Sequence, residues 1–329
     1  MAMEVCRKKT SCGKKIASID IGSHTARMLI SEFVDSPQLF RPVARRSAYT
    51  SLGEGFKGNE EGDISNEAIA RTVNVLQKFV SSAKRYGVDE FRAVSTGVVR
   101  RAGNRKNFID SVKARSGIDV ELISGSREAL LTRRGVLHGS GNVDSGSNVI
   151  FDLGGGTTEF IWGEDDNLRI KSLPVGALVL TQGYFNSDPP GEDEIPALSS
   201  EIDLILKRGL SREKDSLNNI KLTVSGGTAT TLAAIIKGFG VRKIVPEKIN
   251  GLIIERAQIE TLFNHMTSMP LSRRRRIKGM EQGRAGVILA GALAVLRIMY
   301  FFKCTEMMVS YSDILEGIII SYILEGDNE

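Results

Sequence analysis

The chain has 329 residues, which exceeds one ordinary domain and predicts two. Hydrophobic residues make up 41% of it, enough for packed cores, and 25% of the residues are charged. The net charge of +5 favours attraction of a polyanion, but only 6% of the residues are aromatic and none accompany basic stripes, which argues against nucleic acid as the partner.

The amino-terminal segment, the cysteines and one apolar stretch together indicate the compartment. Residues 1–15 are basic and lack the apolar core of a secretory signal, so we expect a flexible tail. Cys6, Cys12 and Cys304 are odd in number and have no Cys-x-x-Cys spacing, which predicts free thiols in a reducing compartment. Residues 287–302 are apolar but too short for a membrane span, which predicts a buried helix. We therefore expect a cytoplasmic protein without a membrane partner.

The first motif in chain order is an apolar strand that ends in Asp20 and is followed by Gly22, Ser23 and a second apolar strand. This pattern predicts a strand, a tight turn and a strand. His24 lies inside the turn, where its ring can hydrogen-bond a ligand.

The next stretch alternates helices and strands. Ser65 is a candidate N-cap, and apolar residues at helical spacing follow it as far as Val80. Residues 91–95 and 120–124 read as strands, with a helix over 107–116 between them. This alternation predicts an α/β sheet.

Arg100 and Arg101 follow the end of the strand predicted over 91–95. A guanidinium fork in that position can bind phosphate oxygens bidentately, although a solvated pair near a helix start is the alternative.

Residues 150–160 form the most informative stretch, because three glycines stand between two apolar runs. This pattern predicts a strand, a glycine-rich turn and a second strand. We expect Gly154, Gly155 and Gly156 to adopt φ > 0 and to turn several N–H groups toward an anion, with Thr157 and Thr158 adding hydroxyl donors. A glycine-rich turn with surface acids is the alternative.

Two carboxylates flank this turn. Asp152 and Glu159 are hard oxygen ligands suited to Mg²⁺ or Mn²⁺, and Asp20 occupies the place of Asp152 in the first motif. The repeated unit predicts two similar domains that face each other across a cleft. We expect a ligand with a chain of phosphate groups to lie between their loops.

A third glycine loop follows residues 223–225, where Gly226, Gly227 and Thr228 end a strand and open a helix. Such a helix start offers N–H groups and a favourable dipole to an anion.

Residues 273–276 are four consecutive arginines. They are either a solvated helix face or a landing patch for polyphosphate, and the sequence alone leaves both possibilities open.

These loops carry a family resemblance. Asp-x-Gly-Ser, Asp-x-Gly-Gly-Gly-Thr-x-Glu and Ser-Gly-Gly-Thr are similar to the phosphate and nucleotide loops of the actin/sugar-kinase/heat-shock-protein ATPase superfamily. Residues 95–104 and 122–129 further resemble the exopolyphosphatase/guanosine pentaphosphate phosphatase family, over about 16–324 of this chain.

The resemblance implies the short form of that family, an α/β protein with two ribonuclease-H-like, actin-like ATPase domains across a central cleft. The amino-terminal domain would span 16–132 and the carboxy-terminal domain 133–311, with the last helix, about 312–325, packing back on the first. It also implies a homodimer.

For the site, the resemblance implies that Arg100 faces the substrate and that Glu128 activates the attacking water. The family signature near the end of the chain departs here, because Tyr311, Asp313 and Leu315 replace an acid, a glycine and an arginine. We expect the loss of one cation for phosphate at Leu315. The expected phosphate-binding residues are Gly22, Ser23, His24, Arg100, Gly154, Gly155, Gly156, Thr157, Gly226, Gly227 and Thr228; the expected metal ligands are Asp20, Asp152 and Glu159.

The function implied is a metal-dependent exopolyphosphatase that releases terminal orthophosphate from polyphosphate, or that hydrolyses guanosine pentaphosphate to tetraphosphate in the stringent response. Two alternatives stay open. One is an ATP-dependent kinase of the same superfamily, and the other is a weakly active or non-catalytic regulator that binds the alarmone.

Overall fold

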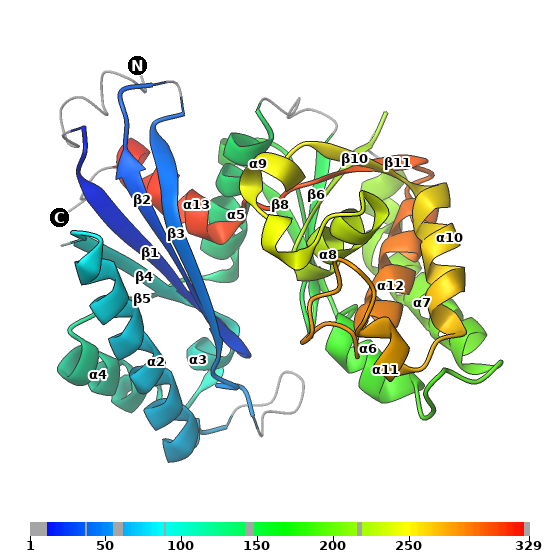
Figure 1. The fold of residues 1–329 in the computed structure, drawn as a ribbon, viewed down its shortest axis with the longest axis horizontal. Coiled ribbons are helices and arrows are strands. Elements are labelled where there is room, and N and C mark those ends of the chain that lie inside the picture. The colour runs from blue at the N-terminus through cyan, green and yellow to red at the C-terminus, as the bar shows by residue number, and fades with distance from the viewer. Residues whose placement is uncertain are drawn as a thin grey trace. The chain divides into compact units, whose positions relative to one another are not determined.

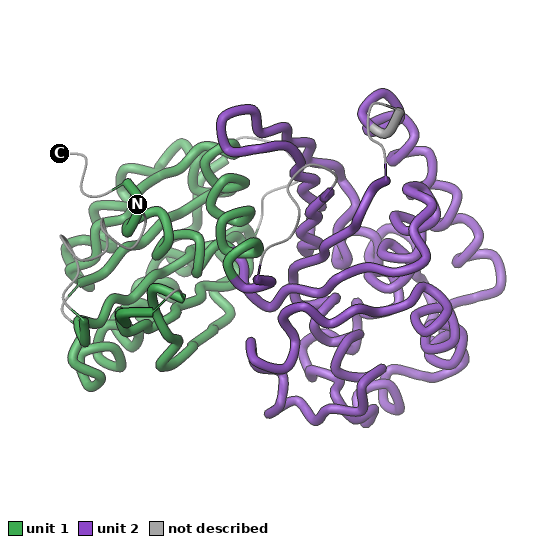
Figure 2. The backbone as a smooth tube through the Cα atoms, turned by 90° about the horizontal axis from the view of Figure 1, so that it is seen from above, with its two compact units in different colours: residues 1–138, 314–329 green, residues 139–313 purple. Residues whose placement is uncertain are grey.

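The computed structural model describes residues 12–36, 38–54, 62–88, 90–141, 148–215 and 219–325. The chain divides into two compact units, of which unit 1 contains residues 1–138 and 314–329 and unit 2 contains residues 139–313 (Figure 2). Residues 1–11 of the predicted basic tail lie outside the described residues. The prediction was wrong for residues 12–15, because Gly13 and Lys14 exchange backbone hydrogen bonds with Phe33 and β1 begins at Lys15. Each unit is an α/β structure with its own sheet and core, as the alternation of strands and helices predicted.

The sheet of unit 1 has the order β3-β2-β1-β4-β5 (Figure 1). The first three strands form an antiparallel meander, and the other two run parallel to β1. The carboxyl ends of the three parallel strands therefore meet at one edge of the sheet. The strands are β1 (Lys15–Ile21), β2 (Thr25–Phe33), β3 (Phe40–Tyr49), β4 (Glu90–Ser95) and β5 (Val120–Leu122).

Helices cover both faces of this sheet. On one face α2 packs with α4 over an apolar core, and α2 begins at the predicted N-cap, where Ser65 Oγ accepts a hydrogen bond from the Ala68 N–H. On the other face α13 packs on β1 and β2. The helices of this unit are α2 (Asn66–Arg85), α3 (Gly97–Arg101), α4 (Arg105–Ser116), α5 (Gly125–Ser140) and α13 (Ile314–Glu325).

Helix α13 is supplied by the end of the chain and packs closely in unit 1. A Cβ atom on Gly317 would lie 1.7 Å from the Leu131 carbonyl oxygen of α5, so only glycine permits this approach of the two helices. Glu316, which is 2% exposed, forms a buried ion pair with Arg45 of β3. Breaking such a pair leaves an uncompensated buried charge, so the pair fixes α13 on the sheet.

Leu315 lies in the apolar core of unit 1. It is 2% exposed and belongs to a cluster with Ile16, Phe33 and Ile319. The side chain is enclosed by the sheet and the rest of α13, which does not support the expectation that phosphate has lost a cation at Leu315.

We expect Leu315→Arg to destabilise the protein by about 3 kcal/mol or more, because it places an unpaired charge in this cluster. Urea unfolding of the variant would measure the loss, with Leu315→Met, which conserves volume, costing under about 1.5 kcal/mol. A variant with arginine that unfolds at the midpoint of the parent would contradict the core assignment.

The sheet of unit 2 has the order β10-β11-β9-β6-β7-β8. Its strands β6, β7 and β8 are antiparallel, and β9 and β11 run parallel to β6, so the unit repeats the arrangement of unit 1 and adds the antiparallel edge strand β10. The strands are β6 (Asn148–Leu153), β7 (Thr158–Trp162), β8 (Arg169–Leu173), β9 (Lys221–Ser225), β10 (Leu252–Glu255) and β11 (Glu306–Val309).

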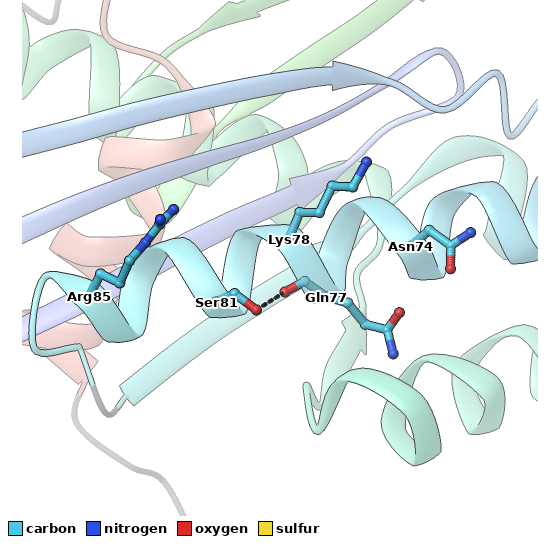
Figure 3. A pocket seen from close by; sticks show the side chains of 5 residues that line it. All are labelled: Asn74, Gln77, Lys78, Ser81 and Arg85. Carbon is cyan, nitrogen blue, oxygen red and sulfur yellow. Dashed lines mark hydrogen bonds between the residues drawn. The ribbon is translucent and has the colours of Figure 1, made fainter.

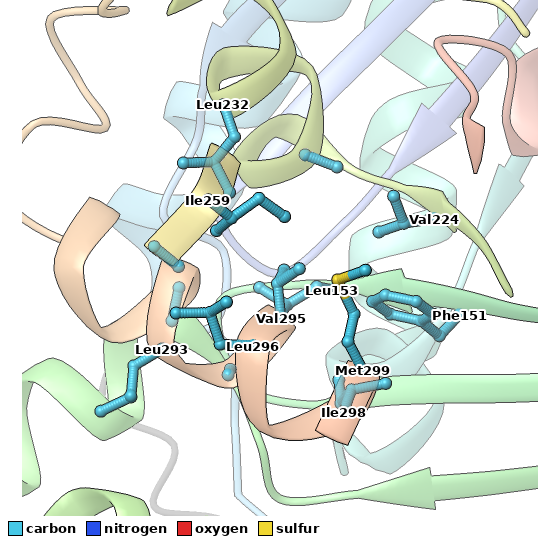
Figure 4. Close-up of a cluster of buried hydrophobic side chains, with 14 of the residues drawn as sticks. Phe151, Leu153, Val224, Leu232, Ile259, Leu293, Val295, Leu296, Ile298 and Met299 are labelled. Atoms are coloured by element: carbon cyan, nitrogen blue, oxygen red, sulfur yellow. The ribbon is translucent and has the colours of Figure 1, made fainter. Parts of the chain in front are cut away.

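The core of unit 2 is built around α12, which is buried along almost its whole length. Figure 4 shows side chains of this helix, Val295 and Met299 among them, together with Phe151 and Val224 of the sheet. This is the buried helix predicted over 287–302. The helices are α6 (Ala177–Tyr184), α7 (Glu194–Asp215), α8 (Gly227–Ile236), α9 (Pro246–Ile249), α10 (Arg256–Thr267), α11 (Leu271–Arg274) and α12 (Ile288–Phe301), with 3-10 turns η1 (Asp165–Asn167) and η2 (Val241–Lys243).

Across the described parts of the chain, no helix combines the length and apolar character that crossing a membrane requires.

Candidate phosphate-binding site

The loops after β1 and β6 form the same turn. The Gly22 N–H donates to the Thr25 carbonyl oxygen at 3.0 Å, and the Gly154 N–H donates to the Thr157 carbonyl oxygen, also at 3.0 Å. A Cβ atom on either glycine would lie 3.2 Å or 3.1 Å from that oxygen, so the turn favours glycine. In each loop an aspartate precedes the glycine by two residues, at the end of the strand. The sequence repeat is therefore also a structural repeat.

The three glycines of the second loop do not adopt the conformation expected of them. Positive φ angles occur at other glycines, and Gly154, Gly155 and Gly156 are not among these. The loop lies against the start of α6. A Cβ atom on Gly176 would lie 2.2 Å from the Gly156 carbonyl carbon, so this close approach requires glycine at position 176. The prediction of φ > 0 was wrong, and the loop is shaped instead by the hydrogen bond from the Gly154 N–H to Thr157. The expectation of a hydroxyl donor at Thr158 was also wrong, because this buried hydroxyl donates to the Val175 carbonyl oxygen at 2.5 Å.

The contact with α6 also orients the peptide groups of the loop. The carbonyl oxygen of Gly154 accepts from the Ala177 N–H at 3.0 Å, and that of Gly155 accepts from the Leu178 N–H at 2.9 Å. In a trans peptide the N–H points opposite to the carbonyl, so the N–H groups of Gly155 and Gly156 point away from α6. A Cβ atom on Gly156 would meet nothing within 4 Å, so there is open space beside this residue.

Asp152 and Glu159 stand directly opposite each other on β6 and β7, so their side chains share one face of the sheet. Asp152 faces the third loop, because a Cβ atom on Gly226 would lie 2.9 Å from its Oδ1 atom. Glu159 accepts a hydrogen bond from Ser172 Oγ at 2.8 Å. Both carboxylates are half-buried beside the glycine loops.

The third loop ends β9 and opens α8, as predicted. Gly226 has φ +98°, and a Cβ atom there would lie 2.8 Å from the Leu153 carbonyl oxygen, so this position requires glycine. Thr228 is 2% exposed, and its side chain packs where a Cβ atom on Gly291 would lie. Its hydroxyl is therefore enclosed by α12, so the groups that this loop can offer an anion are the backbone N–H groups of the first helical turn, as the sequence predicted.

Arg284 covers the start of α8. A Cβ atom on Gly227 would lie 1.7 Å from the Cζ atom of this guanidinium group, and Arg284 Nε donates to Glu281 Oε2 at 3.1 Å. The sequence offered Arg284 as a candidate cation for phosphate but did not show that it lies at this helix start, because the approach of residues 281–284 to α8 is long-range and leaves no local pattern.

In unit 1, Asp20 is 7% exposed, and its Oδ2 atom accepts hydrogen bonds from Nη2 and Nε of Arg27 at 2.7 and 3.1 Å. Ser23 lies beside the start of α3, since a Cβ atom on Gly97 would lie 3.7 Å from its Oγ atom. The His24 side chain is exposed, and its carbonyl oxygen accepts from the Thr50 N–H at 2.8 Å. The first loop is thus held by the sheet edge on which α3 begins.

The structure brings Arg100 to the start of α5, the helix that carries Glu128. The parallel strands end level, with Ile21 paired to Ser95 and Ser95 to Leu122. Arg100 Nη1 donates to the Ile123 carbonyl oxygen at 2.8 Å, just before the first turn of α5. Glu128 is half-buried in that turn, and its N–H donates to the Ser124 carbonyl oxygen.

The first turn of α5 is also tied to the carboxyl end of α13. Arg127 Nη1 and Arg134 Nη1 both donate to Glu325 Oε1, at 2.8 and 2.5 Å. Hydrogen bonding from Arg127 lowers the pKa of Glu325, and the same bond raises the pKa of Arg127. The carboxylate therefore stays ionised at neutral pH, and the ion pair keeps the residue next to Glu128 in place.

Two further observations concern a surface hollow and possible metal ligands. A hollow over α2 is lined by Asn74, Gln77, Lys78, Ser81 and Arg85, none of which is a predicted site residue (Figure 3). Within the described ranges, no group of three or more His, Cys, Asp or Glu side chains is arranged to hold a metal ion.

Two α/β units that share one strand order and repeat one Asp-x-Gly turn define the two-domain actin-like ATPase class. Residues 30–325 match the Ppx/GppA phosphatase family, and the chain belongs to that family. The chain is thus a phosphatase by family, and the resemblance read from its motifs is confirmed.

Solved structures and curated sequences that resemble this chain support the same family assignment. A Ppx/GppA family member from Aquifex aeolicus has a TM-score of 0.79 and 30% identity, covering 96% of this chain and 99% of that one. An exopolyphosphatase from Cytophaga hutchinsonii has a TM-score of 0.81 and 26% identity, covering 94% and 98%. Exopolyphosphatase 2 of Mycobacterium tuberculosis is 28% identical over 93% of this chain and 98% of its own length.

We expect Gly156→Ala to lower kcat/KM for phosphate release by roughly tenfold to a hundredfold, because the methyl group occupies space that a ligand needs. Its fold should be unaffected, since φ is not positive and the space is open. Gly183→Ala in α6 is the matched control, because its added methyl group also meets nothing within 4 Å. Equal activity of both variants in a phosphate-release assay would argue against a ligand at Gly156.

Proposed function

We propose that the chain is an exopolyphosphatase that releases terminal orthophosphate from inorganic polyphosphate. The observation that carries the proposal is the position of Arg100, whose guanidinium group is bound at the helix start that bears Glu128. A cation for phosphate and a carboxylate for water thus lie at one sheet edge of unit 1. Relatives of nearly the same length from Mycobacterium tuberculosis and Haemophilus influenzae carry the names exopolyphosphatase and putative exopolyphosphatase.

Each unit offers its own phosphate donors in this proposal. The N–H groups of Gly155 and Gly156 point away from α6 and serve as donors to phosphate oxygens, and Gly22 and Ser23 do so in the repeated loop. The α8 start contributes the backbone of Gly227 and Thr228. Thr157 and His24 are both exposed and add side-chain donors. Fixed donors of this kind stabilise the charge that develops during phosphoryl transfer.

Glu128 is the proposed general base. A carboxylate within hydrogen-bond reach of a water molecule orients it and accepts its proton as the phosphorus is attacked. The ion pair between Arg127 and Glu325 and the hydrogen bond from Arg100 to the Ile123 carbonyl hold the start of α5 on either side of the residue. Such support reduces the reorganisation that the reaction requires.

A divalent metal, Mg²⁺ or Mn²⁺, fits the carboxylates of unit 2. Mg²⁺ keeps several water ligands and binds one or two carboxylates together with substrate phosphates, which suits the pair formed by Asp152 and Glu159. Asp20 already holds Arg27 with its Oδ2 atom, so we assign it a water-mediated role. When bound, the metal neutralises charge on the phosphate oxygens.

We also propose, from the resemblance alone, that the protein is a homodimer in the cytoplasm.

Phosphate release without any acceptor distinguishes this function from a kinase and from a non-catalytic regulator. We expect release from polyphosphate that stops when a chelator is in excess and returns when Mg²⁺ or Mn²⁺ is restored. Guanosine pentaphosphate, measured in parallel, tests the second substrate of the family. Full turnover in chelator would exclude the metal, and release from neither substrate would exclude the proposed activity.

We expect Glu128→Gln to lower kcat by about 10²–10⁴-fold, the usual contribution of a general base, and to leave polyphosphate binding nearly intact. The glutamine keeps the size and hydrogen bonding of the side chain but removes its basicity. The measurement is kcat beside a directly measured Kd for both proteins. Loss of binding in step with kcat would make Glu128 a structural residue instead.

A further inference from the structure

The positive charge of the chain is concentrated in two segments of unit 2. Residues 237–248 and 271–286 together contain ten lysines and arginines and two glutamates, a net charge of +8. The whole chain carries +5, so all other residues together carry −3. The basic character of the protein is therefore a property of these two segments.

The two segments lie against each other along α8. Gly279 has φ +94°, and a Cβ atom there would lie 2.8 Å from the Phe239 carbonyl oxygen and 3.1 Å from Ala234, at the carboxyl end of α8. Arg284 covers the opposite end, at Gly227. The loop between α11 and α12 thus runs beside α8 (Figure 1). Because α8 has ten residues, the basic segment extends about 15 Å from the third loop.

The four arginines of residues 273–276 divide into one structural residue and three exposed ones. Arg274 is 4% exposed, and it donates to the Met269 carbonyl oxygen and pairs with Asp188, both at 2.5 Å. It therefore anchors the segment. Arg273, Arg275 and Arg276 are exposed, and no ion pair of theirs occurs within the parts of the chain that the structure describes.

These exposed cations form a surface whose like charges are crowded. Similar charges at neighbouring positions repel one another, and the segments contain only Glu247 and Glu281 to offset ten cations, so a bound anion would relieve much of the repulsion. The exposed large aromatic residues of the described chain, Tyr49 and Tyr300, lie outside both segments. The aromatic residue inside them, half-buried Phe239, already has Lys248 Nζ 5.5 Å from its ring centroid, which argues against stacking of bases here. We define the basic surface as Lys237, Arg242, Arg273, Arg275, Arg276 and Lys278, all exposed.

We propose that the basic surface binds the part of a polyphosphate chain that extends beyond the terminal phosphoryl group. This inference rests on the proposed function and adds a preference for long chains. Each internal phosphate carries a negative charge, so a long chain meets successive cations along the side of α8. Tripolyphosphate is too short to reach from the third loop to the far end of the helix.

The test is a triple variant, Arg273→Ala/Arg275→Ala/Arg276→Ala, which leaves the anchoring Arg274 intact. Exposed ion pairs contribute up to about 1 kcal/mol each, so we expect KM for long-chain polyphosphate to rise about tenfold or more. We expect kcat/KM for tripolyphosphate to change by less than about twofold, since this substrate does not reach the surface. The effect should diminish at high salt, because salt screens exposed charges.

The matched control is Lys78→Ala/Lys84→Ala/Arg85→Ala, which removes the same charge from exposed positions of α2 in unit 1. Its KM for long-chain polyphosphate should stay close to that of the parent. An equal rise in KM for both triple variants would mean that the effect depends only on the net charge of the protein, and it would overturn the proposal.

Further outcomes separate this inference from the function on which it rests. If the parent releases phosphate from neither substrate, the proposed function fails, and direct binding of long-chain polyphosphate to parent and triple variant still tests the surface. Equal losses on long-chain polyphosphate and tripolyphosphate would overturn the proposal, as would an unchanged KM. Single-stranded RNA that competes with polyphosphate as strongly as polyphosphate itself would assign the surface to nucleic acid instead.

Discussion

One backbone hydrogen bond shapes the loop that follows the first strand of each unit. It joins a glycine N–H to the threonine carbonyl three residues later, at Gly22 in unit 1 and at Gly154 in unit 2. Its net contribution to stability is about 1 kcal/mol, but it decides where the peptide groups and the preceding aspartate point. In unit 2 the start of α6 then binds the carbonyl oxygens of the loop, so the N–H groups stay available on the other side. Backbone geometry, rather than side-chain charge, therefore decides where the N–H groups of these loops point.

The candidate base depends on a helix that the chain supplies last. Helix α5 carries Glu128, and α13 packs on it through the contact of Gly317 with the Leu131 carbonyl and through the ion pair of Glu325 with Arg127. The buried pair of Glu316 with Arg45 fixes α13 to the sheet in turn. These contacts come from segments far apart in the chain, so the first turn of α5 is rigid only when unit 1 is complete. A rigid support of this kind is what an aligned general base needs.

The net charge of the whole chain does not show how unevenly the charged residues are distributed along it. A net charge of +5 is unremarkable for 329 residues, yet two segments beside α8 carry +8. One arginine of the run is enclosed and pairs with Asp188, which fixes the segment, and its neighbours are left exposed. A local field of this kind attracts anions to one side of unit 2 more strongly than the net charge suggests, because nearby charges dominate at physiological salt.

The sequence by itself determined the α/β class, the two strand–turn–strand motifs and the loop that opens α8, because glycine spacing and apolar periodicity act over a few residues. It also identified Arg100 and Glu128 through resemblance, and the tertiary structure then brought them to one helix start. Only the tertiary structure decided that Leu315 is a core residue, that the Thr228 hydroxyl is enclosed and that Arg284 lies over Gly227. Each of these depends on packing between segments distant in the chain. Local patterns report backbone preferences, whereas burial and long-range contacts exist only once the chain has folded.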